Sequence, residues 1–250
     1  MPLNISGSIV NSAIASTLNY KSIVTRGLAF QLEAGAPDSY PETGTTWFDL
    51  ITSANNGTLT NGPTFSSTNG GVIVFDGTND YVNFSNVLNF ERTNPFSINF
   101  WIKAPVPQYY LAVINKLTWA AGAKGWRILS NYNGSGLAFT ITDNHTVTDI
   151  YLNLPGVLDN TWKHCCFTYD GNGNTNGMKA YLNASLTASG GGGNLTTTTT
   201  SNTNLGIFGG DGTDNSYGNG TLANMLVYNR TLSSTEITQN YNAQKSRFGL

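Results

Sequence analysis

The chain has 250 residues, of which 39% are hydrophobic, 12% aromatic and only 10% charged, with a formal net charge of −2. Soluble proteins usually carry about 25% charged residues, so the helix formers Lys, Glu and Arg are too scarce here for a coiled coil or a helical bundle. The aromatic content excludes intrinsic disorder, because so much apolar area is not left in water. Since β-sandwiches often reach roughly 200–250 residues as one unit, we expect an all-β, mostly single-domain protein.

Residues 1–26 differ from the rest of the chain. Their apolar residues are spaced among Ser, Asn and Gly without a consistent period, so the segment cannot form a core of its own. Two interpretations stay open: a frayed terminus, or an assembly arm that adds to a neighbouring subunit. In the second interpretation the contacts of the arm are made by Ile5, Ile9, Ile14 and Leu18.

From residue 27 onward, short runs of β-branched and aromatic residues alternate with turn clusters. The four Gly residues at 190–193 predict a flexible loop, and the Thr run that follows is compatible with an exposed strand. Ser233 and Glu236 form a capping-box pattern, which predicts a helix over 234–244. The predicted strands are 28–32, 72–75, 81–84, 96–103, 111–115, 125–130, 136–142, 148–152, 162–169, 178–183, 204–208 and 221–228.

The 12 basic residues are scattered singly, whereas binding to nucleic acid needs clusters of Lys and Arg. We therefore expect no nucleic-acid partner. No stretch approaches the ~20 apolar residues of a membrane span, and no basic residue precedes Lys21, as a secretory signal would require. The sequence predicts neither membrane insertion nor secretion. Cys165 and Cys166 are interpreted as two small apolar residues of a buried strand, because neighbours in a strand point to opposite faces.

Five local patterns, taken together and in this order, resemble the concanavalin A-like lectin/glucanase jelly roll of the LamG type over residues 27–250. Some residues of these patterns have an expected structural role: Asp76-Gly77 is a turn signal, and Trp162 and Tyr169 are expected to pack between the sheets. The patterns are WFDL…NNGTL at 47–59, VFDGTNDYV at 74–82, PFSINFWIK at 95–103, WKH…TYDG with MKAYLN at 162–183, and LANMLVYNRTLS at 222–233.

The resemblance implies a two-sheet antiparallel β-sandwich with a short C-terminal helix and an extended N-terminal arm. The last residues, Arg-Phe-Gly-Leu, resemble the ending of LamG-like virion proteins of tailed bacteriophages. This implies a structural protein on the surface of a phage particle, either a capsid decoration or a tail-fibre module, made in the host cytoplasm. Its expected partners are other virion proteins, further copies of the chain (a trimer is assumed) and host-surface polysaccharide. The alternatives are a Ca²⁺-dependent host-attachment lectin and a polysaccharide hydrolase.

The acidic residues argue against the hydrolase. Retaining glycosidases need two carboxylates about 5–5.5 Å apart, and the four glutamates, Glu33, Glu42, Glu91 and Glu236, are far apart in sequence without a Glu-x-Asp pattern. A pairing of His164 with Cys166 lacks a third group and an oxyanion site. We therefore assign no catalytic residue.

Two kinds of binding site are predicted instead. Asp76, Asn79 and Asp80 crowd one turn with the oxygen ligands that Ca²⁺ prefers. Stacking on a sugar needs an exposed ring near hydrogen-bonding groups, and the stretch 108–132 offers several aromatic residues, with Trp119 in a loop as the first choice. The candidate carbohydrate-binding residues are Trp119, Tyr109, Tyr110 and Tyr132.

Overall fold

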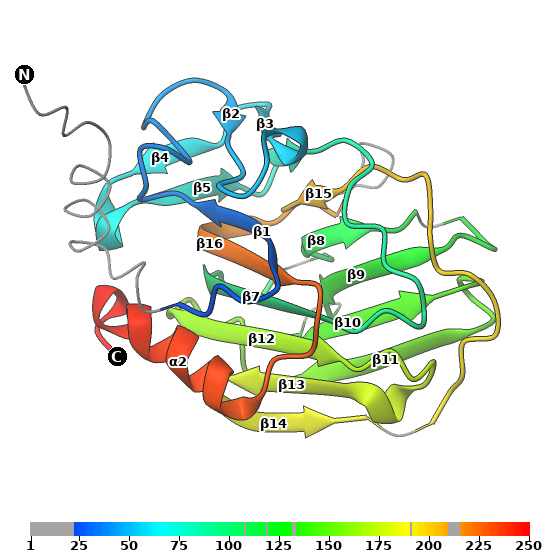
Figure 1. Cartoon of the computed structure of the whole chain (residues 1–250). Helices are drawn as coiled ribbons and strands as arrows, with labels where there is room; N and C mark the ends of the chain where they lie inside the picture. Colours follow the sequence, from blue (N-terminus) through cyan, green and yellow to red (C-terminus); the bar gives the residue numbers. More distant parts are fainter. Residues whose placement is uncertain (1–22, 108, 119, 132–133, 191, 210–215) are drawn as a thin grey trace, which may run out of the picture.

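A computed structural model gives the fold of the chain and describes residues 23–107, 109–118, 120–131, 134–190, 192–209 and 216–250. Within these residues the strands form two eight-stranded sheets (Figure 1). The strand pairs are antiparallel. The predicted antiparallel β-sandwich with a short C-terminal helix is confirmed.

The first sheet, here sheet A, has β16 near its centre, paired with β7, β5 and β1. In spatial order it contains β14 (Ser185–Ser189), β13 (Met178–Leu182), β12 (Lys163–Tyr169), β7 (Phe96–Lys103), β16 (Asn219–Tyr228), β5 (Val72–Asp76) and β4 (Thr64–Ser66), with β1 (Leu28–Glu33) beside β16.

The second sheet, sheet B, ends at β11 on one side and at β2 on the other. In spatial order it contains β11 (Asp149–Leu154), β10 (Leu137–Thr142), β9 (Gly125–Ser130), β8 (Ala112–Lys116), β15 (Gly206–Ile207), β6 (Tyr81–Asn83), β3 (Gly57–Thr60) and β2 (Thr46–Trp47).

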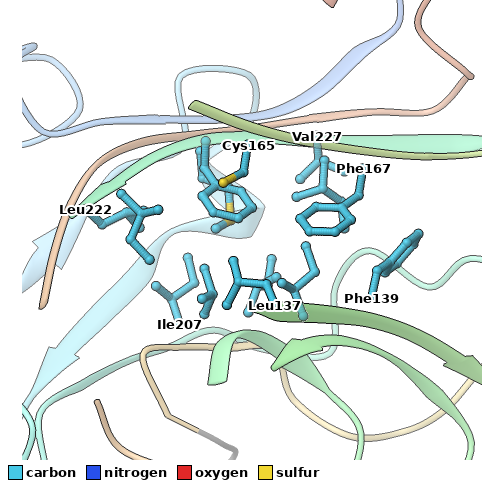
Figure 2. Close-up of a cluster of buried hydrophobic side chains, with 14 of the residues drawn as sticks. Leu137, Phe139, Cys165, Phe167, Ile207, Leu222 and Val227 are labelled. Atoms are coloured by element: carbon cyan, nitrogen blue, oxygen red, sulfur yellow. The ribbon is translucent and has the colours of Figure 1, made fainter. Parts of the chain in front are cut away.

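The main core lies between the two sheets, where alternate residues of each strand point inward. Figure 2 shows side chains of both sheets meeting there: Leu137, Phe139 and Ile207 come from sheet B, and Cys165, Phe167, Leu222 and Val227 come from sheet A. Cys165 and Cys166 are both fully buried and unpaired. They point to opposite faces of β12, because Cys165 belongs to the core between the sheets and Cys166 to a cluster on the outer face.

The outer face of sheet A is covered by the C-terminus of the chain. Helix α2 (Ser234–Gln244) carries the predicted capping box, in which the Ser233 hydroxyl accepts from the backbone of Glu236 and the Glu236 side chain accepts from the backbone of Ser233. The 3₁₀ turn η5 (Lys245–Phe248) continues the helix and stacks Phe248 on Trp101, with ring centroids 4.2 Å apart. Figure 1 shows this C-terminal segment, in red, lying across β12 and β13.

The described end of the predicted arm also lies on this outer face. Ile23 and Val24 are buried in the cluster that contains Ile237 and Tyr228. The Val24 backbone donates to Asn240 at 2.8 Å, and its carbonyl accepts from the Tyr228 hydroxyl at 2.9 Å. Ile5, Ile9, Ile14 and Leu18 lie outside the described residues, so the arm and its boundary at residue 26 stay a prediction.

The structure differs from the sequence-based expectations at three places. The Thr run at 196–200 is not a strand; the edge strand β14 lies before the glycines instead, at Ser185–Ser189. The short strands β2, β3 and β4 were not predicted. Trp162 does not pack between the sheets, because its ring lies against Phe248 on the outer face, 4.5 Å between centroids. Tyr169, by contrast, is buried in the core between the sheets, as expected.

The open side of the sandwich, where β11 of sheet B and β14 of sheet A form the sheet edges, is bridged by the glycine-rich segment. Gly190 donates to the Met178 carbonyl of β13 at 3.1 Å. Five residues later, Leu195 donates to the Gly173 carbonyl at 2.7 Å and buries its side chain in the core. The segment is therefore fixed to sheet A on one side and to the core on the other.

Candidate functional site

Among the described residues, three hollows are large enough for a small ligand, with volumes of about 580, 390 and 350 Å³. The largest of these three lies along β11, on the open side of the sandwich, and is called the β11 groove below. Its lining residues are Asp149, Tyr151, Leu152, Asn153, Thr175, Ser189, Gly190, Gly192 and Gly193.

Tyr151 places an aromatic ring in this groove. In β11 the residues Ile150, Leu152 and Leu154 belong to the core between the sheets, so the period of two turns Tyr151 outward. Its side chain is 58% exposed. An exposed ring with an apolar face and a polar hydroxyl is the feature that lets tyrosine bind amphipathic ligands at protein surfaces.

Hydrogen-bonding side chains surround the ring. Asp149 and Asn153 share the outward face of β11, two residues on either side of Tyr151 and therefore about 7 Å from it along the strand. Thr175 and Ser189 line the groove from the side of sheet A. The groove thus combines one aromatic ring with a carboxylate, a carboxamide and hydroxyl groups on two sides.

Asp149 is held in place by a histidine. The Nδ1 atom of His145 lies 3.0 Å from Oδ2 and 3.2 Å from Oδ1 of Asp149. The histidine side chain is 7% exposed and that of Asp149 26% exposed. Two backbone hydrogen bonds fix the loop around His145, one to the Ala123 carbonyl at 2.8 Å and one from Gly122 at 3.2 Å. The carboxylate therefore faces the groove from a fixed position.

Glycines form the wall opposite β11, and their lack of a side chain lets this segment adopt its backbone conformation and approach Thr175 closely. Gly192 and Gly193 have φ angles of 102° and 76°, which L side chains rarely adopt. A Cβ atom at Gly190 would lie 2.2 Å from Cγ2 of Thr175. The low-complexity tract of the sequence thus has a structural role as a wall.

The other two hollows lack an exposed ring. The hollow of about 390 Å³ lies between β13 and the start of α2, and its one aromatic residue, Tyr181, is 5% exposed. The hollow of about 350 Å³ is lined by Lys124, Asp143 and polar residues. Asp143 accepts hydrogen bonds from the Thr148 hydroxyl and from the backbone of Thr196 and Thr197, which lower the pKa of its carboxyl against the opposing effect of burial.

Of the four predicted carbohydrate-binding residues, the structure describes Tyr109 and Tyr110, and neither lines the β11 groove. Trp119 and Tyr132 lie outside the described residues. Tyr109 and Tyr110 are 68% and 38% exposed and precede β8. Strand β8 is three strands away from β11 in sheet B, roughly 14 Å at the usual spacing. Their role in sugar binding stays a prediction for a separate place on the same sheet.

The predicted calcium ligands form a turn whose carboxylates bond to their own backbone. Asp76 accepts from the Thr78 N–H at 2.7 Å, and Asp80 accepts from the Asp76 N–H at 3.1 Å. Burial raises the pKa of Asp80, opposed by that backbone hydrogen bond, and the neighbouring charge of Asp76 raises it further. Within the part of the chain that the structure describes, no cluster of three or more His, Cys, Asp or Glu side chains is arranged to hold a metal ion. Calcium binding through Asp76, Asn79 and Asp80 stays a prediction.

Two of the four glutamates are used in ion pairs. Glu33 is buried and pairs with Arg247 at 3.0 Å, and Glu236 pairs with Arg230 at 2.7 Å. His164 is fully buried and bonds Asn99 at 2.9 Å, and burial lowers its pKa to about 3. Burial raises the pKa of the Cys166 thiol well above its usual range, which leaves it in its unreactive protonated form.

Tyr151 is not among the residues predicted from the sequence, although the pattern of its strand indicates an exposed ring. The strand at 148–152 was predicted, and the alternation of Ile150, Leu152 and Leu154 identifies the inward face. An aromatic residue in the outward register of such a strand is exposed by geometry. The predicted sugar-binding rings all come from the stretch 108–132, and Tyr151 lies outside it.

None of the described helices has the length and apolar character required to cross a lipid bilayer.

Comparison with known structures supports the fold. Superposition on the receptor-binding domain of botulinum neurotoxin type G gives a TM-score of 0.63 at 17% identity, covering 87% of this chain and 51% of that one. The binding domain of Paraclostridial Mosquitocidal Protein 1 gives 0.66 at 17% identity, with 87% and 52% covered. The ligand-binding domain of botulinum neurotoxin serotype D, solved in complex with N-acetylneuraminic acid, gives 0.63 at 14% identity, with 92% and 53% covered.

These identities establish a shared fold and nothing more, and the chain spans about half the length of each of these domains. Comparison with curated protein sequences gives no match. A family model described as the concanavalin A-like lectin/glucanases superfamily matches residues 76–238. This range includes β11, most of both sheets and the start of α2. The chain therefore belongs to the concanavalin A-like lectin/glucanase superfamily.

Proposed function

We propose that this protein is a non-catalytic carbohydrate-binding module whose sugar site is the β11 groove. The observation that carries the proposal is Tyr151, a ring 58% exposed inside the largest of the three hollows, with Asp149 and Asn153 on the same strand face. Sugars present apolar C–H faces and a rim of hydroxyl groups, so an aromatic ring between hydrogen-bonding side chains matches their chemistry.

The names of the similar structures support the proposal that this chain binds a ligand. Their names describe receptor-binding and ligand-binding domains, and one of them holds N-acetylneuraminic acid. Catalysis by the pair of carboxylates that glycosidases use would need two acids about 5–5.5 Å apart, or about 6.5–9.5 Å for an inverting enzyme. Among the described residues that line the groove, Asp149 is the single carboxylate, so we favour binding without hydrolysis.

The place of action that we propose is the surface of a phage particle, with other virion proteins and further copies of the chain as partners. The support is the resemblance of the last residues to phage virion proteins. Arg247 and Phe248 pack against sheet A, and we assign attachment to the particle to the predicted N-terminal arm, which has no core of its own. Deleting residues 1–22 should abolish incorporation into particles while the module still binds glycan; unchanged incorporation contradicts this assignment.

The sugar site is tested by a glycan array followed by titration calorimetry on the best ligand. Tyr151→Ala should weaken binding at least about ten-fold, which corresponds to ~1.4 kcal/mol. Phe48→Ala is the control, because it removes a 39% exposed aromatic ring next to β2, at the edge of sheet B opposite β11, and belongs to neither candidate site. Equal melting temperatures of the variants show that folding is unaffected.

The same experiment separates the two candidate sites. If Trp119→Ala or Tyr109→Ala abolishes binding and Tyr151→Ala does not, the sugar site is the one predicted from the sequence and the β11 groove is not used. If the wild-type protein binds none of the glycans on an array that includes polysaccharides of bacterial surfaces, the proposed function is refuted.

A further inference from the structure

We propose that the β11 groove selects uncharged glycans over anionic ones, and that Asp149 is the residue that sets this specificity. The inference rests on the proposed function, since it concerns the class of sugar that the same groove takes. It follows from the charges that face the groove and from the way in which Asp149 is fixed.

The described lining of the groove carries one carboxylate and no basic side chain. Besides Asp149, its side chains are those of tyrosine, leucine, asparagine, threonine and serine, together with three glycines. Proteins that bind carboxylate, sulfate or phosphate groups use Arg or Lys for charge-assisted hydrogen bonds. A sialic acid or a uronic acid placed here would meet no such partner among these side chains.

Basic side chains near the groove do not line it. Arg127 of β9 lies on the outward face of sheet B, two strands and roughly 10 Å from Tyr151, but it is buried, with 5% exposed. The two lysines that line a hollow line the other two hollows. Lys124 lies in the hollow of about 350 Å³, together with the carboxylate of Asp143. Lys179 of β13 lines the hollow of about 390 Å³ near the start of α2, together with Asp170. None of these basic side chains is among the described residues that line the β11 groove.

Asp149 cannot easily turn away from a bound sugar. Both of its oxygens lie within 3.2 Å of Nδ1 of His145, whose side chain is 7% exposed and whose backbone is bonded to Ala123 and Gly122. A carboxylate in a fixed position accepts hydrogen bonds from sugar hydroxyl groups and repels a second carboxylate. Two unit charges about 4 Å apart in water repel each other enough for a discrimination of roughly five-fold, and more where water is excluded.

The test measures the affinity ratio between neutral and anionic glycans for the whole chain. Wild-type protein and Asp149→Asn are titrated at about pH 8 and low ionic strength with a neutral polysaccharide (dextran, mannan or the best neutral array ligand) and with polysialic acid and alginate as anionic probes. The wild type should prefer the neutral ligand at least about five-fold. Asp149→Asn should reduce that preference at least about five-fold, whatever its effect on the neutral affinity itself.

Added salt gives an independent readout, because screening acts on charge repulsion and not on stacking. The preference of the wild type should fall as the salt concentration rises toward 1 M, and that of Asp149→Asn should not change. An unaltered ratio in Asp149→Asn, or a wild-type preference for polysialic acid or alginate that is lost in Tyr151→Ala, overturns the inference and leaves the proposed function in place. Absence of all glycan binding refutes the proposed function itself, and the inference with it.

Discussion

Removal of Arg247 should destabilise the protein in a pH-dependent way, because it leaves a buried carboxylate without its cation. Glu33 is 1% exposed, and its carboxylate accepts from Arg247 at 3.0 Å, from Asn224 at 3.2 Å and from Gln244 at 3.1 Å. Breaking one partner of a buried ion pair costs about 3–5 kcal/mol. Since the side-chain amides of Asn224 and Gln244 and the backbone N–H of Gly35 remain as donors, we expect Arg247→Met to lower the free energy of unfolding by about 3 kcal/mol at pH 7.

The pH dependence follows from the pKa of Glu33. Burial raises it, and Arg247 opposes that rise by its charge and its hydrogen bond. In Arg247→Met the pKa rises further, so the folded variant favours the protonated acid. A raised pKa in the folded state gives stability that is present below the unfolded pKa, about 4.5, and is lost as the pH rises through the folded value. The cost of the substitution should therefore shrink markedly between pH 7 and pH 4.

The assay is urea denaturation followed by tryptophan fluorescence at pH 7 and at pH 4. Lys163→Met is the control, because it breaks the pair with Asp159, whose side chains are 17% and 46% exposed; it should cost less than about 1 kcal/mol at pH 7. A loss for Arg247→Met of the same size at both pH values would refute the electrostatic argument. So would a loss below about 1 kcal/mol at pH 7.

Three further predictions concern other parts of the fold. Gly125→Ala should lower the free energy of unfolding by about 3 kcal/mol or more, because its φ is 141° and its Cβ would lie 2.0 Å from the Lys116 carbonyl oxygen. Gly156→Ala is the control and should cost about 1 kcal/mol, since Gly156 has a φ of 72° and open space around it. Equal losses for the two variants in urea denaturation contradict this prediction. Glu236→Gln should cost about 1 kcal/mol at pH 7, and the cost should vanish as the pH falls from about 4.5 toward 2. The hydrogen bond from Arg230 lowers the pKa of Glu236 to about 2, and the stability that this provides is lost as the pH falls through that value. The melting temperatures of the wild type and of Glu236→Gln are compared across this pH range, and a constant difference between them contradicts the prediction. If Ca²⁺ binds at the turn of Asp76 and Asp80, about 1 mM Ca²⁺ should raise the melting temperature, and Asp80→Asn should abolish this rise. A melting temperature that EDTA does not change contradicts calcium binding.

The strands that the sequence predicted well are those whose side chains fill the core. Residues 96–103 and 163–169 combine β-branched and aromatic residues with turn signals at their ends, and the structure buries nearly all of them. The predicted helix, 234–244, has the same first and last residues as α2, because the capping box is a local signal that involves only Ser233 and Glu236.

The strands that were missed are short or lie at sheet edges, and the edge strands β4 and β14 also bury little. In β14, Ser185–Ser189, four of the five residues are exposed, so no apolar alternation marks the strand and its pairing with β13 decides the conformation. The misplaced Trp162 has a similar cause. Its neighbour Phe248 is more than eighty residues away in the chain, and no local pattern shows that a C-terminal turn covers the outer face of sheet A.

The candidate site, too, could be predicted only where it depends on residues close together in the sequence. The outward register of Tyr151 follows from its own strand, but the groove exists because Gly190 is fixed to β13 and Leu195 to Gly173, which places the glycine wall opposite β11. Composition alone described this wall as a loop.

The alternation of inward and outward residues in β11 explains how one strand contributes both to the fold and to the proposed function. Its even-numbered residues, Ile150, Leu152 and Leu154, belong to the core, and its odd-numbered residues face the groove. Because the two sets point to opposite sides, a change at Asp149 or Tyr151 alters what the groove presents without opening a cavity in the core. The outer face of sheet A has no such freedom where α2 and η5 cover it. Specificity can therefore vary at the outward positions of an edge strand while the sandwich stays intact.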